Sequence, residues 1–156
     1  MLKVIPKIWS YSFSVMDGAN SVAQVDLSWW RDRGELRVGD ATYTARRVKS
    51  SYVLESADAV IVRAERPRKL FRQFLIKHAG RQYILRAKSA FRREFRLFDG
   101  GTQVGFISPE GLFTRNAAVK LPKQLPLFLQ VFIIWLAMAM WKHEDNAGAV
   151  TIIAAG

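Results

Sequence analysis

The sequence feature that most constrains the fold is a long apolar segment, Leu125–Trp141, which follows a basic, strand-like sequence. From Leu127 to Trp141 the single polar residue is Gln130. A helix built from these residues has no face that suits water, whereas an ordinary surface helix carries a polar stripe. Such a helix must be surrounded on all sides, either by protein or by lipid.

The preceding sequence, from Trp9 to Ile107, alternates apolar and polar residues with the period of two that β-strands require. Turn signals such as Asp17-Gly18 and Asp99-Gly100-Gly101 separate the alternating runs, at the spacing typical of β-barrels and β-sandwiches. No linker or low-complexity stretch divides the 156 residues. We therefore expect one domain over residues 1–156.

Two surroundings would satisfy the apolar segment. In the first, the strands close into a barrel and the helix fills its interior. In the second, the helix is a C-terminal membrane anchor, with Trp141 and Lys142 at one interface and Lys120 and Lys123 on the cytoplasmic side. The length of Leu125–Trp141 favours the first surrounding, because its helical rise of roughly 25 Å is short of a hydrocarbon core of about 30 Å.

We therefore predict a mainly β fold, a closed antiparallel β-barrel of about ten to twelve strands that encloses one hydrophobic C-terminal α-helix at about residues 125–142. Pro126 suits the first turn of that helix. Residues 143–148 are expected to end it, and Ala149–Ala154 to form a short apolar tail that is interpreted as one last strand.

Several local segments follow this layout in order: Tyr83-Ile84-Leu85, Phe95-Arg96-Leu97, Gly105-Phe106-Ile107 and then the helical Phe132-Ile133-Ile134-Trp135. Between Tyr11 and Trp141 the layout resembles the tubby-like superfamily, which includes the LURP-one-related proteins and the phospholipid scramblases. The resemblance implies a closed β-barrel threaded by its helix. It also implies binding to phosphoinositides or other membrane lipids.

The sequence departs from the scramblases in two respects. Their acidic calcium-binding stretch before the helix is missing, because Asn116–Gln124 contains no carboxylate. Their palmitoylated cysteines are missing too, since the chain has no cysteine. The resemblance therefore does not predict lipid scrambling, and no lipid-binding residue of the tubby proteins is transferred to a position in this sequence.

The positive charge is concentrated in one stretch. Between Arg63 and Arg96, twelve basic residues stand against Glu65 and Glu94, which accounts for ten of the eleven net positive charges. An excess of this size attracts polyanions such as phospholipid headgroups or nucleic acid. It is also what a solvated surface that keeps a protein soluble would carry.

Two segments of this stretch are candidate anion-binding sites. Arg66, Arg68 and Lys69 flank a proline, and a loop with that composition resists burial. Arg92 and Arg93 lie at the start of a later predicted strand. If the two segments meet at one end of the barrel, they form a cationic rim that can hold phosphate groups.

These features predict a non-enzymatic module that binds an anionic phospholipid or membrane surface. Trp30 is the candidate for membrane contact, because alternation turns only one of Trp29 and Trp30 toward the core. One alternative is a C-terminally membrane-anchored protein with a cytoplasmic interaction barrel. Another is a nucleic-acid-binding barrel, which would need a stacking platform from Phe91, Phe95 and Phe98.

No catalytic signature is present. The absence of cysteine excludes thiolate nucleophiles and cysteine-ligated zinc, and it suits a reducing cytoplasm. His78 and His143 are isolated and lack metal-ligand spacing, and no G-x-S-x-G or phosphate-binding glycine motif occurs. The sequence thus predicts no enzyme, no metal site and no cofactor. The predicted location is the cytoplasm, either at the surface of a membrane or anchored in it.

Overall fold

The computed structural model of the chain describes residues 1–7, 12–27, 33–66, 72–89, 93–111 and 116–155, and over 145–155 it describes the backbone alone. These residues form twelve strands followed by one helix. In chain order they are β1 (Leu2–Pro6), β2 (Phe13–Asp17), β3 (Asn20–Leu27), β4 (Arg33–Val38), β5 (Ala41–Val48), β6 (Ser51–Ser56), β7 (Ala59–Glu65), β8 (Gln73–His78), β9 (Arg81–Ala87), β10 (Phe95–Asp99), β11 (Thr102–Pro109), β12 (Ala117–Lys120) and α1 (Leu127–Ala155).

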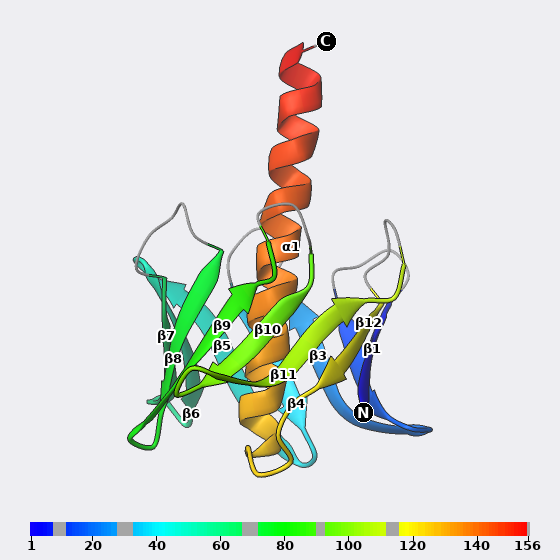
Figure 1. The fold of residues 1–156 in the computed structure, drawn as a ribbon. Helices are drawn as coiled ribbons and strands as arrows, with labels where there is room; N and C mark the ends of the chain where they lie inside the picture. The colour runs from blue at the N-terminus through cyan, green and yellow to red at the C-terminus, as the bar shows by residue number, and fades with distance from the viewer. Residues whose placement is uncertain (8–11, 28–32, 67–71, 90–92, 112–115, 156) are drawn as a thin grey trace.

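The strands close into a single antiparallel barrel in which each strand pairs with the next one along the chain. The barrel is closed by its first and last strands, since Leu2 of β1 lies opposite Val119 of β12 and Val4 lies opposite Ala117. Closure leaves no free sheet edge for another chain to join. The predicted fold class, a closed antiparallel barrel with an apolar C-terminal helix, is confirmed (Figure 1).

The two ends of the barrel differ. The connections after β2, β4, β6, β8 and β10 are two residues each and lie at the end where α1 begins, which we call the turn end. In the turn between β8 and β9, Ala79 and Gly80 both have positive φ (48° and 75°), as a two-residue turn that matches strand twist requires. The remaining connections lie at the opposite end, where α1 leaves the barrel (Figure 1). We call this the exit end.

The helix runs through the barrel and is covered on every side. All residues from Val131 to Trp141 are at most 5% exposed, and they span about three helical turns. A barrel of about eight strands can fill itself with its own side chains, so one of twelve strands has room for a helix. The strands contribute inward-facing residues such as Leu36, Leu54 and Phe95 to the same core.

The apolar segment of α1 is surrounded by protein, namely by the strands of the barrel. Within the described residues, Leu127–Glu144 is long and apolar enough to cross a membrane, yet 78% of it is buried inside the structure. Gln130, the polar residue of the segment, lies near the start of α1, where its Nε2 donates a hydrogen bond to the carbonyl oxygen of Leu125 (2.9 Å).

The predicted end of the helix was wrong. The helix was expected to end within residues 143–148, and Ala149–Ala154 was interpreted as a strand, but α1 continues to Ala155. The polar residues after Lys142 each cost at most about 0.7 kcal/mol in a helix relative to Ala, and no proline lies between them and Ala155. A helix that is already formed can add such residues at little cost, because nucleation is the difficult step. The polar cluster therefore marks where α1 leaves the barrel rather than where it ends.

One contact between strand and helix is unusually close. Gly34 of β4 packs against the Trp135 indole of α1, and a Cβ on Gly34 would lie 2.5 Å from Trp135 Nε1 and 3.0 Å from the Asp26 carbonyl oxygen. Trp135 Nε1 itself is buried and has no hydrogen-bond partner among the described residues. The glycine on β4 thus makes room for Trp135, one of the two tryptophans of α1, inside the barrel.

This contact predicts that Gly34→Ala lowers the free energy of unfolding by about 1–3 kcal/mol, the usual cost of overpacking a core. Urea denaturation of the purified protein measures it. The cost of Gly34→Ala should shrink in a Trp135→Phe background, because a smaller ring leaves room for the methyl group. The comparison variant is Gly39→Ala, whose Cβ meets nothing within 4 Å and whose cost of about 1–2 kcal/mol comes from positive φ alone, independently of Trp135. Equal costs of Gly34→Ala in both backgrounds would contradict the proposed packing.

Candidate functional site

The exit end brings the two predicted basic segments together. The β7–β8 and β9–β10 connections both lie there, because alternate connections of such a barrel share an end. The topology therefore places the starts of both predicted segments at one end of the barrel, and the cationic rim stays a prediction. Of the predicted anion-binding residues, Arg66 and Arg93 are within the described part of the chain. The others, Arg68, Lys69 and Arg92, lie outside the described residues, and so does Trp30.

Arg93 is held against the helix. It precedes β10 by two residues, and its carbonyl oxygen accepts a hydrogen bond from Trp141 Nε1 (2.9 Å). Its guanidinium carbon lies 4.9 Å from the centre of the Trp141 ring, which is the geometry of a cation–π contact. Arg66 follows β7 and is also half-buried, with its backbone N–H directed at the Ser50 carbonyl oxygen (3.4 Å). Both residues thus combine a structural role with a position at the exit end.

Arg72 is an organising residue that the sequence did not single out. Its Nε and Nη2 donate to the two carboxylate oxygens of Glu144 (2.5 and 3.0 Å), and its Nη1 donates to the Ser89 carbonyl oxygen (3.1 Å). Its guanidinium carbon lies 5.5 Å from the Phe95 ring centre. Arg72 therefore joins the β7–β8 connection, the β9–β10 connection and α1 where the helix leaves the barrel.

A second group of cations covers the outer face of β7–β10. We call Arg63, Lys77, Arg86 and Arg96 the basic wall; they alternate with buried residues along these strands. The strand register places Arg63 opposite Lys77 and Arg86 opposite Arg96. Like charges directly opposite each other destabilise a sheet. These two pairs of like charges therefore lower the stability of the sheet, and the fold retains them.

The basic wall is only partly neutralised. Lys77 pairs with Glu65 (3.6 Å), and Glu94 is shared by Arg96 and Lys88 (3.4 Å to each). Within the described residues no ion pair joins Arg63 or Arg86 to a carboxylate. The Arg86 guanidinium carbon instead lies 4.5 Å above the Phe98 ring centre. Arg63 and Arg86 are both exposed, so their charge is available to an external anion.

Charge is also distributed unevenly along the barrel axis. The turn end carries four carboxylates within or beside its short turns (Asp17, Asp40, Asp58 and Asp99), together with the cations Arg81, Lys120 and Lys123. The described residues in the exit-end connections are mainly basic: Lys7, Lys49, Arg66, Arg72, Lys88 and Arg93, against Glu94 and Glu110. In an anionic field the molecule would therefore turn its exit end toward the negative surface.

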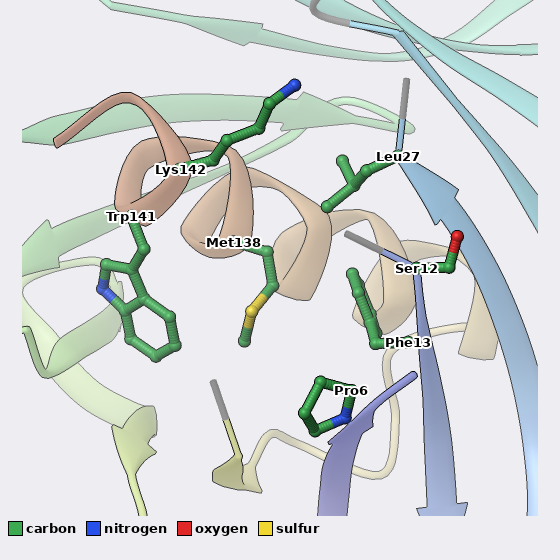
Figure 2. A pocket seen from close by; sticks show the side chains of 7 residues that line it. All are labelled: Pro6, Ser12, Phe13, Leu27, Met138, Trp141 and Lys142. Atoms are coloured by element: carbon green, nitrogen blue, oxygen red, sulfur yellow. The ribbon is translucent and has the colours of Figure 1, made fainter. Parts of the chain in front are cut away.

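Two hollows flank the helix. At the exit end a narrow apolar slot lies between α1 and the ends of β1–β3, where Phe13, Leu27 and Met138 converge while the side chain of the buried Lys142 points away from Met138 (Figure 2). Its volume of about 10 Å³ is close to that of one water molecule, so it is too small for a lipid chain. At the turn end an open groove of about 780 Å³ lies beside Lys120 and Lys123, at the opposite end of the barrel from the β7–β8 and β9–β10 connections.

Both histidines lie at or near the protein surface. His78 ends β8 and contacts the Phe128 ring edge-to-face (5.5 Å between ring centres). His143 lies exposed on α1, which continues past it. Within the described ranges no group of three His, Asp or Glu side chains could hold a metal ion.

The aromatic rings considered for nucleic-acid stacking are not exposed where they are described. Phe95 is fully buried, and Phe98 lies beneath Arg86. Phe91 is outside the described residues. In the part of the chain that the structure describes, the exposed large apolar side chains are Met1, Ile5 and Val60, none of which is aromatic.

Comparison of the chain with protein-family models, with curated proteins and with solved structures found no match. The residues and their geometry therefore carry the functional argument.

The clamp between Arg72 and Glu144 gives a prediction. The Arg72 side chain is 16% exposed and Glu144 36%, so a double-mutant cycle with Arg72→Met and Glu144→Gln should give a coupling energy of about 1–3 kcal/mol in urea denaturation. The exposed Arg81–Asp99 pair (66% and 35%) serves as the control and should couple by less than about 1 kcal/mol. Equal coupling in the two cycles would contradict the assignment of Arg72 as the organising residue.

Proposed function

We propose that this protein is a non-catalytic module that binds anionic phospholipid surfaces through the exit end and the adjoining basic wall. The observation that carries the proposal is the difference in charge between the two ends: carboxylates and cations nearly balance at the turn end, and cations are in excess at the exit end. An anionic bilayer presents many negative headgroups on one flat surface, so it contacts many separate cations of a protein at once.

The basic wall supports the same proposal. The cross-strand repulsion between Arg63 and Lys77 and between Arg86 and Arg96 is relieved when phosphate groups lie over these strands. Each basic residue near an anionic leaflet contributes about 1 kcal/mol, so a few of them produce reversible attachment. A flat surface also needs no deep pocket, which agrees with the small volume of the slot at the exit end.

Lipid binding is favoured over nucleic-acid binding by the surface chemistry. Single-stranded nucleic acid is held by base stacking on exposed aromatic rings as well as by charge. The described surface offers cations without such rings, because Phe95 is buried and Phe98 is covered by Arg86. Headgroup phosphates require only the cations.

Co-sedimentation with liposomes tests the proposal. Binding should appear with phosphatidylserine or phosphoinositide in a phosphatidylcholine bilayer, and it should weaken as salt is raised. The double variant Arg63→Ser/Arg86→Ser should bind about tenfold to thirtyfold more weakly at low salt, since it loses two basic residues worth about 1 kcal/mol each.

A matched variant separates position from net charge. Lys3→Ser/Arg37→Ser also removes two exposed cations, but from β1 and β4, and it should leave the affinity within about threefold of wild type. Equal loss in the two variants would show that net charge alone determines binding. No binding to anionic vesicles at low salt would refute the proposed function.

A further inference from the structure

The helix extends well beyond the barrel. Among the residues of α1 whose side chains are described, Lys142 is the last buried one, and the backbone continues as helix to Ala155, clear of the exit end (Figure 1). We call residues 147–155 the projecting tail. Its sequence contains no charged residue and includes Val150, Ile152 and Ile153.

The projecting tail begins next to the connections at the exit end. Glu144, which Arg72 clamps, and Trp141, which Arg93 contacts, both lie on α1 just before the tail. The polar sequence 143–146 therefore lies between the buried part of α1 and the apolar tail. An apolar segment beside connections with an excess of cations is the arrangement expected of a bilayer-inserting element, with cations at the phosphates and apolar side chains beneath them.

We propose that the projecting tail inserts into the interfacial layer of an anionic bilayer while the exit-end connections and the basic wall contact the headgroups. The inference rests on the proposed function and specifies its mode. It assigns the apolar part of the binding to residues 147–155, outside the barrel, and the ionic part to the exit end.

The position of the basic wall determines how residues 147–155, which rise about 13 Å as a helix, insert. The basic wall lies to one side of the helix axis, which tilts the barrel toward β7–β10. The tail is therefore inserted at a shallow angle near the headgroups.

A second copy of the chain is a less suitable partner. Tail-to-tail association would bring two basic exit ends together, and their charges repel. An anionic bilayer instead complements the exit end while it covers the tail.

Because the chain contains no cysteine, a single environment-sensitive label can be placed on the full-length protein. The fluorophore NBD is attached to Ile153→Cys in the tail and, as a control, to Asp40→Cys in an exposed turn at the turn end. With phosphatidylserine vesicles, the emission of the tail label should rise and shift to the blue, and the control label should not respond. A triple variant, Val150→Ser/Ile152→Ser/Ile153→Ser, should bind these vesicles at least about tenfold more weakly than wild type.

The control variant Val60→Ser removes an exposed apolar side chain (47% exposed) from β7 near the turn end and should bind like wild type. If the protein co-sediments with vesicles but the tail label does not respond and the triple variant binds normally, the tail inference is overturned and the proposed function remains. Absence of co-sedimentation overturns both. A blue shift that depends on protein concentration without vesicles identifies self-association and also overturns the inference.

Discussion

The structure depends on one constraint, an α-helix that has no polar face. Between Val131 and Trp141 every residue needs an apolar neighbour, and a surface position would leave at least one side of the helix in water. A closed barrel surrounds a helix completely. A barrel of twelve strands in turn needs more filling than its own side chains provide. Helix and barrel therefore stabilise each other, and Gly34 shows how closely they fit, since its position has no room for a Cβ beside Trp135.

The same constraint arranges the surface. Because α1 follows β12 and runs the length of the barrel, the end at which it leaves is the end of the β7–β8 and β9–β10 connections. Arg72 and Arg93 attach these connections to the last buried turns of the helix. The charged loops and the projecting tail are thus placed side by side by the fold, although Arg72 and Glu144 are 72 residues apart in sequence. Closure by β1 and β12 also makes the barrel dependent on contacts between distant segments, which slows folding.

The sequence predicted the barrel and its helix, because alternation and an all-round apolar segment are strong signals. It did not identify the two strands that close the barrel: β1 includes Pro6, and the four residues of β12 are too few to show a period. The end of α1 was misplaced because polar residues were taken for a stop. At the site, sequence placed the basic segments but could not show that the carboxylates of the short turns gather at the opposite end. That separation follows from pairing order, which sequence composition does not contain.

These features describe a β-barrel whose stability comes from the threaded helix and whose proposed binding to anionic membranes comes from the charged end around it. The central claim, that α1 is the core of the barrel, is tested most directly by native-state hydrogen exchange in detergent-free buffer. The amides of Val131–Trp141 should exchange only with global unfolding, as slowly as the central residues of the strands, and those of 147–155 much faster. If the amides of Val131–Trp141 exchange quickly while those of the strands stay protected, α1 is not the core of the barrel.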